Sequence, residues 1–173
     1  MKNLIKLKHP LIIGTVIPLF LYLVMAELIQ GGAAYIAGSK GVSFTVSGIK
    51  LHALFLLNTG SVTAAVIYLI PYFVMFLSFS GAVTGLKKAL PGYYRHLLIV
   101  IAVVSSGLLI FSLFQGGFSI VLGLNSDNDY VVLKNYLKLS QTEGVIAVFL
   151  MVILTGGYLN LLLKRILTYI KTN

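Results

Sequence analysis

The sequence predicts an all-α integral membrane protein: a four-transmembrane-helix bundle with a small extracytoplasmic β-rich cap. Four long apolar segments support this prediction, at residues 10–30, 62–86, 97–115 and 145–163. Each is close to the ~20 residues that a helix needs to cross a ~30 Å hydrocarbon core. Hydrophobic residues make up 58% of the chain and the mean hydropathy is +1.00, against roughly 45–50% apolar residues in a soluble domain.

We expect residues 1–173 to form a single membrane domain. The four segments leave two outer loops, at 31–61 and 116–144, and one cytoplasmic loop at 87–96. None of these loops reaches the ~50 residues of a small independent domain. The lipid bilayer is therefore the first partner that the sequence predicts, in a multi-pass protein of the cell membrane.

The basic residues are divided unequally between the two sides of the predicted bundle. Nine of the thirteen lie beside the chain ends and the 87–96 loop: Lys2, Lys6, Lys8, Lys87, Lys88, Arg95, Lys164, Arg165 and Lys171. The positive-inside rule therefore places both termini in the cytoplasm. The net charge of +9 does not indicate a nucleic-acid partner, because cations beside spans bind anionic headgroups at roughly 1 kcal/mol each.

The amino terminus has a second interpretation. A lysine-rich start, an apolar run and the small residues 32–34 are also typical of a secretory signal peptide. The apolar run from residue 11 to 26 is long, however, and continues past Glu27. We therefore expect an uncleaved first span, whereas cleavage would leave three spans and an extracytoplasmic amino terminus.

The first outer loop has a strand pattern. Apolar and polar residues alternate from Val42 to Val46 and again from Ile49 to His52. This pattern predicts a β-hairpin that turns at Ser47 and Gly48. Residues 53–57 are apolar and fit either an extension of the second strand or a segment along the membrane.

The second outer loop allows two structures. Residues 118–124 are apolar and partly β-branched, and residues 125–129 are a dense turn signal of Asn, Ser and Asp. Residues 130–139 fit a strand or a short helix. Strands from both loops would pair into one small sheet over the outer ends of the helices. Ser140 to Glu143 matches a capping box at the start of the fourth span.

Glu27 is the only acidic residue within a predicted span. Carboxylates in spans are rare and often mark ion or proton paths. Glu27 lies about 4.5 Å from the outer end of its span by helical rise, within reach of Lys40 or Lys50. We expect a structural role at the interface, with proton transport or ligand binding as the alternative.

Other polar and small residues complete the candidate sites. The candidate intramembrane polar site consists of Glu27, Ser105, Ser106, Thr155 and Asn160, with hydrogen bonds between helices as the expected role. A stripe of Ser78, Gly81 and Gly85 predicts close helix packing. Pro18 and Pro71 predict kinks in the first two spans.

Enzyme chemistry finds little support in this sequence. The chain has no cysteine, and its three histidines lie on different sides without metal-ligand spacing. We found no phosphate-binding glycine loop, nucleophile elbow or zinc-protease motif. We therefore expect no catalytic residues, no cofactor and no metal.

The layout of four spans, inside termini and a strand-bearing first outer loop resembles the claudin and peripheral-myelin-type tetraspan proteins. The resemblance is one of topology alone. The first-loop signature of that family needs tryptophan and paired cysteines, and this chain has neither. No functional residue is carried over from it.

These observations predict a non-enzymatic accessory, assembly or interaction subunit that presents its cap to another membrane protein or to a second copy. The alternative is a small transporter or channel component that uses Glu27 and the proline-kinked first two spans. A dry helical core would favour the first function. Water that reaches Glu27 and the serines of the third span would favour the second.

Overall fold

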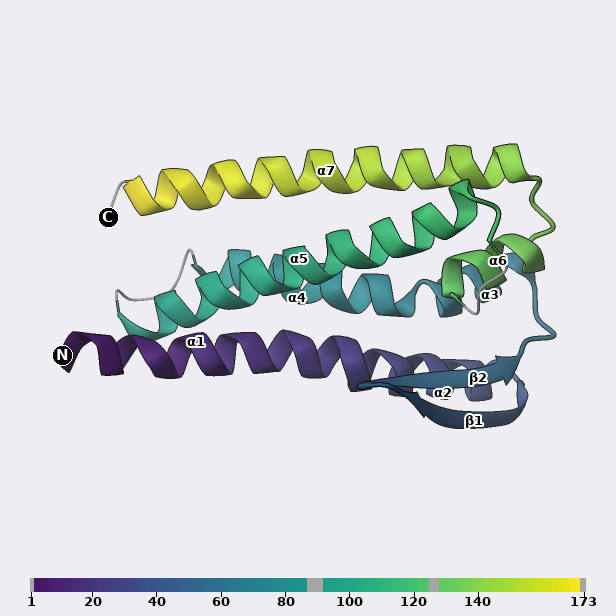
Figure 1. Ribbon diagram of the computed structural model, residues 1–173, viewed down its shortest axis with the longest axis horizontal. Coiled ribbons are helices and arrows are strands. Elements are labelled where there is room, and N and C mark those ends of the chain that lie inside the picture. Colours follow the sequence, from purple (N-terminus) through teal and green to yellow (C-terminus); the bar gives the residue numbers. More distant parts are fainter. Residues whose placement is uncertain (1, 87–91, 125–127, 172–173) are drawn as a thin grey trace.

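The computed structural model describes residues 2–86, 92–124 and 128–171. It is mostly helical (77%), with one small antiparallel sheet of two strands. Its elements run α1 (Lys2–Phe20), the π-helical turn η1 (Leu21–Met25), α2 (Ala26–Ile36), β1 (Lys40–Ser47), β2 (Lys50–Leu56), α3 (Ser61–Tyr68), α4 (Ile70–Leu86), α5 (Tyr93–Val121), α6 (Asp129–Tyr136) and α7 (Gln141–Lys171) (Figure 1).

Three helical segments of the described chain are long and apolar enough to cross a membrane: Lys8–Ile36, Tyr93–Val121 and Gln141–Leu161. The fourth apolar segment is divided into α3 and α4, which are bent by 55° at a break around Leu69. Pro71 follows this break, and its ring nitrogen has no hydrogen to donate to the preceding turn. This pair counts as a fourth span only if its two helices cross the membrane together.

The first helical segment continues through Pro18 without a break in the helix. The π turn η1 begins three residues later and joins α1 directly to α2. Tyr22, Ala26, Gln30 and Ala34 are all buried, four residues apart, so one face of this segment is turned inward. Glu27 lies beside that face, in the first turn of α2.

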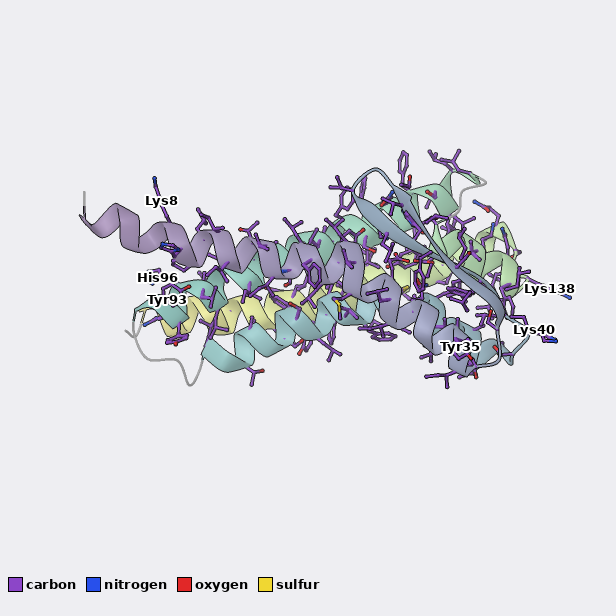
Figure 2. The ribbon with its side chains drawn as sticks, turned by 90° about the horizontal axis from the view of Figure 1, so that it is seen from below. Lys8, Tyr35, Lys40, Tyr93, His96 and Lys138 are labelled. Atoms are coloured by element: carbon purple, nitrogen blue, oxygen red, sulfur yellow. The ribbon has the colours of Figure 1, made fainter. Side chains whose placement is uncertain are left out.

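The long helices lie side by side along the longest axis of the molecule (Figure 1). The start of α1 and the end of α7 lie at one end, whereas the sheet, α3 and α6 lie at the other. Figure 2 shows the same division by residue, with Lys8, Tyr93 and His96 far from Tyr35, Lys40 and Lys138. We call the second end the outer end.

An apolar core lies among η1, α4, α5 and α7. Its buried members are Tyr22, Met75, Phe79, Ala82, Val83, Ala102, Leu109 and Leu159. A smaller cluster at the outer end packs α6 against α5 through Leu113, Ile120, Tyr130 and Val131. The outward faces of the long helices keep many exposed apolar side chains.

The structure confirms the hairpin in the first outer loop. The turn lies one residue later than predicted, because Ser47 ends β1 and pairs with Lys50, and Gly48 (φ +62°) and Ile49 make the turn. β2 extends to Leu56, so residues 53–56 belong to the strand. The hairpin lies along α2 with its turn directed toward the middle of the molecule (Figure 1).

The predicted strands of the second outer loop are wrong in the described residues. α5 continues through Val121, and the helical alternative for the later segment is correct because α6 begins at Asp129. Asn128 caps α6, since its Oδ1 accepts a hydrogen bond from the backbone N–H of Tyr130 at 3.0 Å. The Asn and Asp residues that indicated a turn therefore lead into a helix, with Asn128 as its N-cap. Residues 125–127 lie outside the described residues.

Candidate functional site

Glu27 fixes the hairpin to α2. The residue is only 2% exposed. Its Oε1 lies 2.9 Å from Lys50 Nζ, and its Oε2 accepts a hydrogen bond from the backbone N–H of Ala53 at 3.0 Å. Both partners belong to β2. A two-stranded sheet leaves backbone N–H groups unpaired along its edges, and Glu27 satisfies one of them.

Lys50 is held as a cation in this position. Its side chain is 23% exposed, and Nζ lies 5.0 Å from the centroid of the Tyr22 ring, within the range of a cation–π contact. Burial lowers the pKa of Lys50, but the Glu27 carboxylate outweighs this effect and the net shift is upward. The ion pair is therefore present throughout the neutral pH range.

A second polar contact joins α2 to α6. Gln30 is fully buried, and its Nε2 donates a hydrogen bond to Asp129 Oδ1 at 3.1 Å. Gln30 Oε1 is buried without a hydrogen-bond partner among the described residues. Burial raises the pKa of Asp129 to about 6, and the Glu27 charge acts in the same direction; the Gln30 hydrogen bond and Lys50 oppose both.

We refer to Glu27, Gln30, Lys50 and Asp129 as the outer polar cluster. It connects α2, β2 and α6, three elements that are distant in sequence. A further contact holds α6 to the linker before α3: the hydroxyl of Tyr136 donates to the Thr59 carbonyl at 2.6 Å and accepts from the Thr59 N–H at 3.2 Å. The elements β1, β2 and α6, which we call the outer cap, are thus held to α2 and to the linker before α3 by polar contacts.

The structure does not bring the five residues of the predicted intramembrane polar site together. Ser105 is buried and pairs with Ser78 across α4 and α5, with 2.9 Å between the hydroxyl oxygens. Thr155 is buried and its hydroxyl lies 2.7 Å from that of Tyr72. Ser106 donates to a carbonyl of its own helix, and Asn160 is exposed.

The predicted packing stripe is close to α5 at only part of its length. A Cβ at Gly85 would lie 3.2 Å from Leu98 Cδ1, whereas a Cβ at Gly81 would meet nothing within 4 Å. The closest approaches occur at other glycines. A Cβ at Gly14 would lie 2.8 Å from Val100, and one at Gly31 would lie 2.6 Å from the Phe44 ring.

Sequence reasoning did not single out Gln30, and it treated Asp129 as a turn residue. One signal was available for Gln30, because residues three apart on a helix share a face and Gln30 follows Glu27 at that spacing. No local signal connects Gln30 to Asp129, which lies 99 positions later in the chain.

Two open apolar grooves lie elsewhere on the surface. One, of about 470 Å³, lies between α2 and α3 and is lined by Ala33, Ile36, Ala37, Val62, Thr63, Val66 and Ile67. The other, of about 220 Å³, lies between α4 and α7 and is lined by Tyr72, Phe73, Phe76, Leu154, Thr155 and Tyr158. Neither groove is lined by a residue of the outer polar cluster.

The side chains of the outer polar cluster can pair charges and can bind or release protons. In the part of the chain that the structure describes, no three His, Asp or Glu side chains are grouped to hold a metal ion. We found no match to this chain among protein-family models, curated proteins or solved structures.

Proposed function

We propose that the chain is a non-enzymatic membrane protein with four spans and both termini in the cytoplasm. In this proposal it acts as an accessory or assembly subunit that presents its outer cap to another membrane protein. α3 and α4 together form the second, bent span. The unequal distribution of basic residues supports the orientation, since most of them lie away from the outer end.

Helix lengths support a position for the bilayer. On three helices, a basic residue at the cytoplasmic side is separated from a polar residue at the outer side by about 28 to 32 Å of helical rise. This separation matches the ~30 Å thickness of the hydrocarbon core. The pairs are Lys8 with Glu27, Arg95 with Gln115, and Lys164 with Glu143. Glu27 then lies at the outer boundary, and most of the outer cap lies beyond it.

The observation that carries the proposal is the engagement of both Glu27 oxygens by β2. An ion-conducting carboxylate must exchange its partner with a passing ion, whereas Glu27 has a cation and a backbone N–H in direct contact. The buried hydroxyls of Ser105 and Thr155 are likewise each paired with a neighbouring helix. These contacts favour a structural role for the polar groups.

The hairpin supplies a surface for a partner. Val46, Ile49 and Leu56 are 73%, 83% and 84% exposed, on a sheet that Glu27 holds against α2. Ile49 lies at the turn and Leu56 at the opposite end of β2, so the hairpin presents apolar side chains along its whole length. A rigid base lowers the entropy that such a surface loses on binding.

A photo-crosslinking amino acid at Ile49 or Leu56, in native membranes, tests this function. We expect both positions to give an adduct with the same membrane protein, identified by mass spectrometry. Lys50→Met should abolish both adducts because it releases the hairpin. A crosslinker at Ile110 on α5, which is exposed toward lipid, is the control and should give none. Absence of an adduct at both cap positions would contradict the proposal, and an adduct of twice the mass would identify a second copy as the partner.

A small transporter or channel component is the second candidate. One observation favours it: irregular backbone at membrane depth is tolerated where it is buried or lines a cavity, and α3 and α4 break at Leu69. Reconstituted vesicles distinguish the two functions. An ion or solute flux that wild type shows and that a folded Glu27→Gln variant lacks would favour transport over the interaction role.

A further inference from the structure

The charges of the outer polar cluster do not balance. Glu27 and Lys50 form an ion pair, which leaves Asp129 as a second carboxylate without a cation in direct contact among the described residues. A carboxylate removed from water favours its neutral form unless a cation compensates it. When Asp129 is ionised, the cluster therefore carries one negative charge that its single cation does not compensate.

The amide of Gln30 is hydrogen-bonded to Asp129 through only one of its two polar atoms. Its two amide atoms are adjacent, but only Nε2 has a partner, the Oδ1 of Asp129. Oε1 is buried and receives no hydrogen bond from any described residue. Buried acceptors are nearly always satisfied, and the side chain nearest to this amide by hydrogen bonding is Asp129, so Oε1 is open to a donor on that carboxyl group.

We propose that Asp129 and Gln30 form a proton-binding site, in which Asp129 Oδ2 carries the proton and donates it in a hydrogen bond to Gln30 Oε1. The neutral carboxyl then makes two parallel hydrogen bonds with the amide, one in each direction. Release of the proton leaves only the bond from Nε2. Proton uptake therefore strengthens the attachment of α6 to α2, whatever partner the outer cap binds.

Of the described groups in this region, Asp129 is the one that we expect to gain or lose a proton near pH 6. Glu27 on α2 and Lys50 on β2 are held as an ion pair, and Lys50 has a raised pKa. Tyr130 on α6 has a pKa that burial raises, and it stays neutral. α5 contributes to this region the hydroxyl of Ser112, which lies 3.4 Å from that of Tyr130.

The direction of the pH effect follows from the raised pKa of Asp129, about 6 against an ordinary 3.8. The folded protein binds the proton more tightly than the unfolded chain does. Stability from this site is therefore greatest below about pH 4 and decreases as the pH rises through about 6. Above that range α6 is held by fewer hydrogen bonds.

Two measurements on the full chain in lipid nanodiscs test the site. Infrared difference spectra should show a protonated carboxyl group that titrates near pH 6 and is absent in Asp129→Asn. Hydrogen exchange, corrected for the intrinsic effect of pH, should show α6 amides roughly tenfold better protected at pH 5 than at pH 7.5. Exchange in Glu143→Gln, a change of an exposed carboxylate at the start of α7, should depend on pH as in wild type.

The variants separate proton binding from a general loss of structure. Asp129→Asn supplies a permanent N–H donor for Gln30 Oε1, so α6 should stay protected at both pH values. Gln30→Met removes both hydrogen bonds, so protection of α6 should be lower than in wild type at both pH values. A wild-type α6 whose protection is the same at both pH values would overturn the proposal. So would a carboxyl signal that persists in Asp129→Asn, or a titration that sodium shifts and choline does not.

Discussion

At the scale of the residue, Glu27 illustrates how a charged side chain is accommodated at the end of a span. Its carboxylate is nearly inaccessible to water, so its stability depends on Lys50 and on the N–H of Ala53. Removing one partner from a buried ion pair usually costs more than removing both, because the remaining charge is left without compensation. The two members of this pair differ in exposure, and that difference leads to a prediction.

Lys50→Met should destabilise the fold more than Glu27→Gln does. Lys50→Met leaves a buried carboxylate with one N–H donor, at a cost of about 2 to 4 kcal/mol. Glu27→Gln leaves a lysine that is partly exposed and keeps water contact, at a cost of about 1 to 2 kcal/mol. The free energy of unfolding in mild detergent, measured for both variants, gives this order.

The double variant Glu27→Gln/Lys50→Met provides the control for that comparison. It contains no unpaired charge, so its stability should exceed that of Lys50→Met alone. If the stability lost by the double variant equals the sum of the losses of the two single variants, the interaction between Glu27 and Lys50 contributes nothing to stability.

At the scale of the element, the hairpin depends on how closely it approaches α2. The Phe44 ring of β1 occupies the space where a side chain at Gly31 would lie, 2.6 Å from its Cβ. Gly32, the next residue, has nothing within 4 Å of that position. These adjacent glycines make a matched pair for testing the contact.

Gly31→Ala should loosen the hairpin, whereas Gly32→Ala should not. The added methyl group at residue 31 forces Phe44 away from α2, and overpacking of this kind costs about 1 to 3 kcal/mol. At residue 32 the same change should stabilise the helix by about 0.5 to 1 kcal/mol, because glycine is a poor helix former. Hydrogen exchange of the β2 amides measures both effects.

The local elements were the most predictable from sequence. Alternation over a few residues was enough to predict the hairpin and its turn at Gly48, because strand pairing across a tight turn depends on neighbouring residues. The Asn and Asp cluster before Asp129 gave an ambiguous signal, since the same side chains favour turns and helix N-caps. Only the packing of Tyr130 and Val131 against α5 resolves it in favour of a helix.

Long-range contacts were not predictable in the same way. Lys50 was named as a possible partner of Glu27 because both lie near one outer boundary. The contact of Gln30 with Asp129 depends on how α6 returns to α2 after the hairpin and three intervening helices, and no sequence periodicity predicts that return. Similarly, the spacing of Gly81 and Gly85 in the sequence predicts close packing at both residues. In the structure only Gly85 lies near another helix, at Leu98 of α5.

At the scale of the whole molecule, the polar groups are unevenly distributed along the long axis. The long helices are connected within the apolar core by separate pairs of hydroxyl groups, such as Ser78 with Ser105. The ion pair of Glu27 with Lys50 lies at the outer end. A bilayer placed over the apolar length therefore leaves the outer cap beside water on one side, and this placement is open to a direct test.

Single-cysteine labelling tests the topology without prior removal of any native cysteine, because the chain has none. A membrane-impermeant thiol reagent added to intact cells should label Lys40→Cys, which is exposed in the outer cap. It should not label Lys8→Cys or Tyr94→Cys until the membrane is opened, since these positions are exposed at the opposite end. An even number of spans requires Lys8 and the chain end after α7 to share one side, so a tag after residue 173 should also be protected. Labelling of Tyr94→Cys from outside would contradict the proposed topology of four spans.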